Sequence, residues 1–294
     1  MIRCLFVAAL VALFTGCGGS SRPPSALKTF LLADTHAPLR IVDRPFASKQ
    51  PRVRVREVSF AGRRERVNAY IAVPARANGR LASVVLLHGT GGTRSDFLPY
   101  AVKLAQRGFA ALTLTAPSSA ALDPASGLAP RVLLTRQQQL SADDVVAVRR
   151  AVDFLDTRAT IDPHRIGVVG WSSGARTAAV VAGVEPRIRA FVLMSAGAVP
   201  VSDYARLAPA SLRSEITKVL TTVDPLRWIA RGRRGSIFLQ DGLRDEVVPR
   251  RALKAIVRAA PPRTRVRWYD AGHPLNRAAV HEQLTWLEQR LAST

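Results

Sequence analysis

Residues 166–183 read IGVVGWSSGARTAAVVAG, and this stretch decides the fold. The β-branched run Ile166–Val169 predicts a strand, and the small residues that follow predict a helix over Ser173–Ala182. Between them, GWSSG at residues 170–174 has the spacing G-x-S-x-G. A strand-to-helix turn this tight strains the serine backbone, and glycines flank it because side chains there would collide with the strand and the helix. Ser172 is therefore a candidate nucleophile at a helix N-terminus; the alternative is a plain helix N-cap.

A serine hydroxyl needs a base, and the base needs an orienting carboxylate. The segment LQDGLRDEVVP (239–249) follows a predicted strand and offers Asp241 and Asp245, and YDAGHPLN (269–276) follows the last predicted strand and offers His273. We assign His273 as the base and Asp245 as its partner, with Asp241 as the alternative. The chain order Ser, Asp, His then places all three residues directly after strands, at the carboxyl edge where open α/β sheets carry their sites.

Strands and helices alternate along most of the chain, which predicts an α/β fold with a mostly parallel sheet. An opening hairpin is expected over residues 53–73, and the insertion 198–234 is too long for a connection and predicts a small helical cap. Asp143 and Asp144 are interpreted as a helix start, with Ser141 as the N-cap. Further strands are expected at Leu81–Leu87, Phe109–Leu114, Ala190–Met194, Ser236–Leu239 and Val266–Tyr269, and helices at Ser95–Gln106, Gln138–Asp156, Arg251–Ala259 and Ala278–Leu291. Residues 116–136 are expected to form a loop.

From about residue 53 to residue 292 the chain resembles an α/β-hydrolase, and it is similar to the dienelactone-hydrolase-like esterases. The matching motifs are HGTGG (88–92), GWSSG, DGLRDEVVP (241–249) and AGH (271–273). Dienelactone hydrolase itself uses a cysteine nucleophile, and the serine here points to esters. The resemblance implies an oxyanion hole made by the backbone N–H groups of Thr90 and Ser173, with Gly91 as the alternative to Thr90. His88 is expected to bond within this loop.

These assignments predict a serine hydrolase that cleaves carboxylic esters, small or lipid-like, through an acyl-enzyme. An acyltransferase or peptidase with the same triad is one alternative, and a non-catalytic binding lipoprotein of the cell envelope is another. No cofactor is expected: GTGG lacks the Lys-Ser/Thr of a phosphate loop, and no cluster has metal-ligand spacing. His36, His164 and His281 are interpreted as surface residues.

The first residues have the pattern of an export signal. Residues 1–16 combine a short basic start with an apolar stretch too short to span a bilayer, and they end in small residues before Cys17. This resembles the lipobox of bacterial lipoproteins, although Phe14 stands where that pattern prefers Leu. We therefore expect lipid on Cys17 and anchoring to a membrane of the cell envelope, with a plain secretory signal as the alternative. Residues 17–50 are expected to form a tether and N-terminal extension, and residues 51–294 the hydrolase domain.

The formal net charge is +22, and most of the 43 basic residues are arginines. They are scattered in short clusters without the interleaved aromatic residues of a nucleic-acid-binding surface, so no nucleic-acid partner is expected. Attraction to an anionic membrane surface and a biased composition are the two interpretations of this charge. The oligomeric state is unknown from the sequence.

Overall fold

The computed structural model describes residues 31, 37–47, 50–77, 79–119 and 130–292. Within these residues the strands form one nine-stranded sheet in the order β1-β2-β3-β5-β4-β6-β7-β8-β9. From β5 to β9 neighbouring strands are parallel, whereas β1, β2 and β3 add antiparallel pairings on one side. The strands are β1 Val42–Phe46, β2 Val53–Ala61, β3 Arg66–Pro74, β4 Leu81–Leu87, β5 Ala110–Leu114, β6 Ile161–Trp171, β7 Ile188–Met194, β8 Ile237–Gly242 and β9 Arg265–Tyr269.

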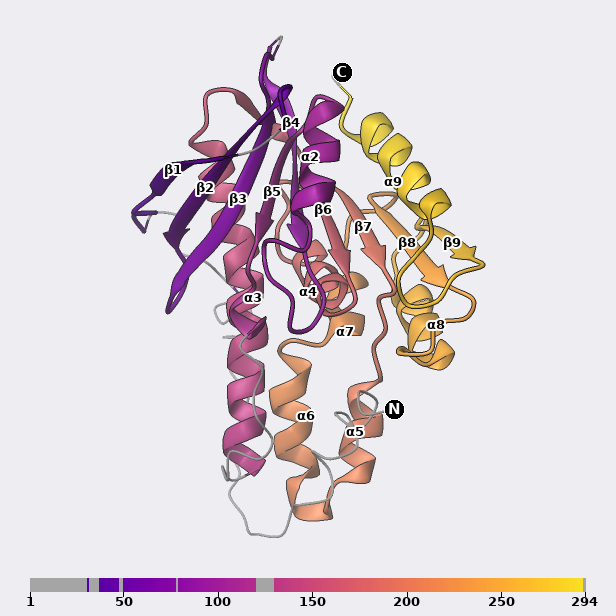
Figure 1. Ribbon diagram of the computed structural model, residues 1–294. Helices are drawn as coiled ribbons and strands as arrows, with labels where there is room; N and C mark the ends of the chain where they lie inside the picture. Colours follow the sequence, from indigo (N-terminus) through magenta and orange to yellow (C-terminus); the bar gives the residue numbers. More distant parts are fainter. Residues whose placement is uncertain (1–30, 32–36, 48–49, 78, 120–129, 293–294) are drawn as a thin grey trace.

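Helices cover both faces of this sheet (Figure 1). Helices α2 and α9 pack on one face, and α3, α4, α7 and α8 contribute to the core on the other. Their bounds are α2 Leu98–Gln106, α3 Pro130–Asp156, α4 Ser173–Ala182, α5 Val201–Leu207, α6 Arg213–Thr221, α7 Pro225–Ile229, α8 Arg250–Ala259 and α9 Arg277–Arg290. The order of elements and the mixed, mostly parallel sheet confirm the expected fold class.

The sequence of strand β4 is apolar except for Ser83, and the position of the strand explains this pattern. Val85 and Leu87 face one core, and Val84 and Leu86 face the other, because successive side chains of a strand point to opposite faces. All seven residues of β4 are buried. A parallel strand covered by helices on both faces has no solvent side, and LASVVLL fits that position.

Helix α3 begins earlier than the sequence predicted. It starts at Pro130, so Ser141 is an interior residue and not an N-cap, and residues 130–136 are helical where a loop was expected. Asp143 and Asp144 are also interior and buried, so the prediction of a helix start there was wrong. The physical reason is tertiary: Leu134 packs against cap residues, which stabilises the first turns of the helix.

The insertion after β7 is helical, as predicted, but it divides into two parts. Helices α5 and α6 extend beyond the carboxyl edge of the sheet beside the first turns of α3 (Figure 1). They form a small separate core in which Leu212 and Ile216 are buried. Helix α7 instead belongs to the main core through Trp228 and Ile229. The cap therefore consists of α5 and α6 and does not include α7.

Three further boundaries differ from the sequence prediction. Strand β1 was missed: it pairs with β2, so the sheet begins upstream of residue 51. It carries Asp43, which forms ion pairs with Arg56 and Arg158, and such long-range pairs leave no local pattern. Helix α2 begins three residues later than expected, and β6 begins at Ile161, five residues earlier than expected.

Candidate active site

Ser172 occupies a strained turn between β6 and α4. Its backbone has φ 56° and ψ −116°, in the region that residues with a side chain rarely adopt. Its N–H donates to the carbonyl oxygen of Met194 at 2.9 Å, which fixes the turn to the end of β7. A Cβ on Gly170 would lie 2.5 Å from the carbonyl oxygen of Gly174, and a Cβ on Gly174 would lie 2.4 Å from that of Leu87. Both glycines of the motif are therefore required by close backbone packing, as predicted.

His273 and Asp245 form the expected pair. Nδ1 of His273 lies 2.9 Å from Oδ2 of Asp245, and the two side chains are 8% and 1% exposed. The other oxygen, Oδ1, accepts hydrogen bonds from the N–H groups of Val247 at 2.9 Å and Val248 at 2.8 Å. Burial alone would favour the neutral acid, but these hydrogen bonds hold the pKa of Asp245 below its usual value. The carboxylate therefore stays ionised and accepts a hydrogen bond from the Nδ1–H group, which leaves Nε2 as the basic nitrogen.

Two side chains, those of Ser195 and Trp171, donate hydrogen bonds to the backbone of His273. The sequence did not predict this role for either of them. The backbone carbonyl of His273 accepts hydrogen bonds from Ser195 Oγ at 2.9 Å and from Trp171 Nε1 at 3.2 Å. The Trp171 and His273 rings lie 5.1 Å apart between centroids. Trp171 directly precedes Ser172, so the histidine loop is bonded to the nucleophile turn itself. Ser195 follows β7 as Ser172 follows β6, and a polar residue directly after a buried strand was the signal that could have found it.

The loop after β4 lies against the same turn. Gly92 N–H donates to the carbonyl oxygen of Gly89 at 3.1 Å, and Gly91 between them has φ 73°, as the third residue of a type II turn requires. A Cβ on Gly89 would lie 3.4 Å from Cβ of Ser172. Gly89, which directly precedes Thr90, therefore lies against the serine, and Ser173 is the first residue of α4, where N–H groups have no intrahelical acceptor.

His88 has the structural role that the sequence suggested. It is buried, its Nε2 accepts a hydrogen bond from the N–H of Ala116 at 3.0 Å, and its Nδ1 lies 2.7 Å from the carbonyl oxygen of Gly89. The first bond places the proton on Nδ1, which then donates to Gly89. His88 therefore joins the loop after β4 to the loop after β5.

Asp144, on α3, binds the loop after β5 through Ser118. Its carboxylate accepts hydrogen bonds from the N–H of Ser118 at 2.9 Å and from Ser118 Oγ at 2.6 Å. Burial raises the pKa of Asp144 to about 7, although the Ser118 bonds oppose the shift. Asp144 and Ser173 line the same small cavity. A buried carboxyl thus fixes the backbone beside the candidate oxyanion hole.

Asp241, the alternative partner for His273, is not bonded to it in the described structure. It lies in β8, one residue before the strand ends, and is 2% exposed. Burial together with the nearby Asp245 carboxylate raises its pKa to about 7. In the structure, the carboxyl that reaches the histidine is therefore that of Asp245.

The raised pKa of Asp241 predicts a pH-dependent stability. Because the folded state holds this proton more tightly than the unfolded chain, the contribution of Asp241 to the free energy of unfolding should fall as pH rises from about 4 to about 7. Asp241→Asn removes the ionisation. The free energy of unfolding of this variant, minus that of the wild type, should therefore be larger at pH 8 than at pH 5. Urea unfolding at both pH values measures this. An equal difference at the two values would contradict it.

The remaining candidates lie apart from this cluster. His164 and His281 are exposed, as expected, whereas His36 and Cys17 fall outside the described residues. In the described part of the chain, no group of three or more His, Cys, Asp or Glu side chains could hold a metal ion. None of the described helices has the length and apolar character needed to cross a membrane.

Comparison with known proteins agrees with this fold. Residues 84–292 match the alpha/beta hydrolase family, and the chain belongs to it. The acetyl xylan esterase from Paenibacillus sp. R4 has a similar structure, with a TM-score of 0.71 and 18% identity over 92% of this chain and 100% of that chain. A protein of Klebsiella pneumoniae subsp. pneumoniae MGH 78578, classed with the dienelactone hydrolases, has a TM-score of 0.60 and 16% identity over 82% and 99%. At these identities the likeness establishes the fold alone.

A similarity in sequence covers a shorter region. The Escherichia coli (strain K12) protein YcjY is 34% identical over 115 residues, which are 39% of this chain and 35% of that protein. The aligned region thus spans about a third of the length of YcjY.

Proposed function

We propose that this protein is a serine hydrolase that cleaves carboxylic esters through an acyl-enzyme. The observation that carries the proposal is the 2.9 Å contact between His273 and Asp245 on a loop bonded, through Trp171, to the strained turn of Ser172. A nucleophile, a base and an orienting carboxylate in this chain order are the requirements for nucleophilic acyl transfer. Esterases among proteins of the same fold support the reaction class.

In the first half-reaction, Nε2 of His273 takes the proton of Ser172 while Oγ bonds to the ester carbonyl carbon. Asp245 stabilises the imidazolium that forms. The N–H groups of Thr90 and Ser173 donate to the oxyanion, and each such donor typically lowers the barrier by about 3 kcal/mol. When the tetrahedral intermediate collapses, the alcohol leaves with the proton from His273 and the acyl group remains on Ser172.

In the second half-reaction, water replaces the alcohol. His273 removes a proton from water, hydroxide adds to the acyl carbonyl, and collapse returns the proton to Oγ and releases the acid. The same two groups thus serve both steps, and no further reactant is needed.

The cap bears on the choice of substrate. Helices α5 and α6 extend past the carboxyl edge of the sheet, where we propose the triad lies, and an acetyl xylan esterase has the same fold. Acetyl esters of sugars are therefore the first substrates to test, beside p-nitrophenyl esters from acetate to palmitate. We expect saturable hydrolysis with one preferred acyl length. No turnover on any of these esters would contradict the proposed activity.

We also propose that the chain is exported and anchored by lipid on Cys17. The apolar stretch before Cys17 and the small residues next to it support this. Cys17→Ala should move the protein from the membrane fraction to the soluble fraction of the expressing cells, and Cys4→Ala is the matched control. Equal membrane association of both variants would contradict the anchor.

A further inference from the structure

The segment that leads from β7 into the cap begins with a second strained serine. Ser195 directly follows β7 and has φ 51°, close to the φ of 56° at Ser172, which directly follows β6. The N–H of Ser195 donates to the carbonyl oxygen of Gln240 in β8 at 2.8 Å, just as the N–H of Ser172 donates to that of Met194 in β7. Ser195 is 0% exposed, so its hydroxyl is not a second nucleophile. The hydroxyl instead serves a partner inside the protein.

That partner is the backbone of the proposed base. Oγ of Ser195 donates to the carbonyl oxygen of His273 at 2.9 Å, which joins the end of β7 to the loop after β9 across the end of β8. The same carbonyl accepts a hydrogen bond from Nε1 of Trp171, beside the nucleophile, at 3.2 Å. These two bonds fix the place of the histidine backbone relative to the turn of Ser172. A misplacement of reacting groups by about 1 Å can cost about 100-fold in rate, so this place matters.

Gly197, two residues further on, packs against a residue that binds Asp245. A Cβ on Gly197 would lie 2.1 Å from Cγ1 of Val248, so only glycine fits while Val248 keeps its position. The N–H of Val248 donates to Oδ1 of Asp245 at 2.8 Å. The next residue, Ala198, donates its N–H to the carbonyl oxygen of Ala252 in α8 at 3.3 Å, which anchors the segment. Residues 195–198 therefore contact His273 directly and Asp245 through Val248.

We infer that residues 195–198 position the histidine and the carboxylate for the reaction. Ser195 is the positioning residue for His273, and Gly197 is the positioning residue for the loop of Asp245. The inference rests on the ester hydrolysis proposed above, and it adds residues that touch neither the substrate nor the reacting atoms. Their loss should therefore slow the chemical step and leave substrate binding unchanged.

Ser195→Ala in the full chain tests the first contact. Alanine keeps the Cβ, bears the same backbone strain and removes only the hydrogen bond to His273. We expect kcat on p-nitrophenyl acetate to fall about tenfold with KM unchanged, and the rate constant of labelling by a fluorophosphonate to fall by a similar factor.

Ser236→Ala is the matched control for this hydroxyl. Ser236 is 3% exposed, and its Oγ also donates to a backbone carbonyl, that of Arg233, at 2.7 Å. It directly precedes β8, at the edge of the sheet opposite to the proposed triad. This variant loses a buried hydrogen bond of the same kind and should keep the wild-type kcat.

Gly197→Ala tests the second contact. The new methyl group should displace Val248, whose β-branched side chain has little rotamer freedom, and with it the N–H that binds Asp245. We expect kcat to fall about 100-fold. Val248→Ala removes the Cγ1 that the methyl group would meet. The double variant should therefore recover to within about threefold of Val248→Ala alone, which is a coupling that two independent losses would not show.

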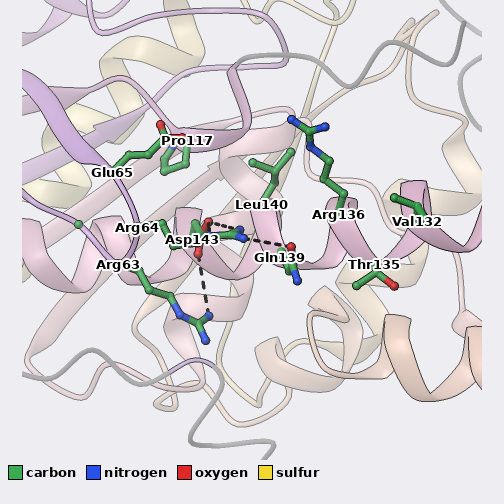
Figure 2. A pocket seen from close by; sticks show the side chains of 11 residues that line it. Arg63, Arg64, Glu65, Pro117, Val132, Thr135, Arg136, Gln139, Leu140 and Asp143 are labelled. Carbon is green, nitrogen blue, oxygen red and sulfur yellow. Dashed lines mark hydrogen bonds and ion pairs between the residues drawn. The ribbon is translucent and has the colours of Figure 1, made fainter. Parts of the chain in front are cut away.

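Gly62→Ala is the matched control for this glycine. A Cβ on Gly62 would also be crowded, at 2.5 Å from the carbonyl oxygen of Glu65. Gly62 lines the cavity beside α3 that Figure 2 shows, and it lies between β2 and β3, which β5 and β4 separate from β6. Gly62→Ala should lower the free energy of unfolding, measured in urea, without lowering kcat of the folded protein.

Several results would overturn the inference. One is a wild-type kcat in folded Ser195→Ala or Gly197→Ala, and another is a loss in Gly197→Ala that Val248→Ala does not reduce. A loss of kcat in Ser236→Ala or Gly62→Ala as large as in the variant that it matches would show that the effect follows stability alone. All of these results leave the proposed function intact. A wild-type chain that hydrolyses no ester would instead overturn the proposed function, and this inference with it.

Discussion

Replacement of Ser172 by alanine should lower kcat for ester hydrolysis by about 10⁵-fold, because it removes the atom that carries the acyl group. The backbone of residue 172 sits at φ 56°, and serine and alanine both carry a Cβ and bear the same strain there, so the variant should fold. Initial rates on p-nitrophenyl acetate give the comparison. A circular dichroism spectrum of each preparation shows whether it is folded.

Ser173→Ala is the matched control for this loss. Ser173 is the next residue, and its proposed role uses its backbone N–H, which alanine retains. Its kcat should stay near the wild-type value. A folded Ser172→Ala variant with wild-type turnover would contradict the mechanism, as would a loss of equal size in Ser173→Ala.

Asp245→Asn should lower kcat by about 10⁴-fold. Asparagine keeps the size of the side chain but can donate to Nδ1 of His273, which would then hold its proton on Nε2 and could not accept one from Ser172. The hydrogen bond from His273 and the buried carboxylate of Asp245 make the expected effect large.

Asp241→Asn is the internal comparison, since Asp241 lies near the end of β8 and Asp245 just after it, and of the two only Asp245 contacts His273 in the described structure. We expect Asp241→Asn to keep most of the activity while changing the pH dependence of stability. If Asp241→Asn abolished turnover and Asp245→Asn did not, the assignment of the third triad member would be wrong.

The sequence predicted the central part of the fold well because that part is encoded locally. Leu81–Leu87 is apolar on both faces, and GWSSG marks a turn that only glycines allow, so β4 and the start of α4 were placed correctly. The candidate triad residues follow buried strands at one edge of the sheet. That rule depends on topology and needs no side-chain detail.

Features that depend on contacts between distant residues were not predicted. The first turns of α3 need Leu134 against the cap, and β1 is an edge strand whose Asp43 pairs with Arg158, far along the chain. The hydrogen bond from Ser195 to the His273 carbonyl joins residues 78 positions apart. In each case the stabilising partner lies too far along the chain to appear in a local sequence pattern.

Labelling with a fluorophosphonate tests the central claim most directly, because the reagent forms a stable bond only with an activated serine. The full chain should gain one adduct, peptide mapping should place it on Ser172, and Asp245→Asn should slow its formation. A folded wild-type chain that gains no adduct, or carries it on another serine, would contradict the account.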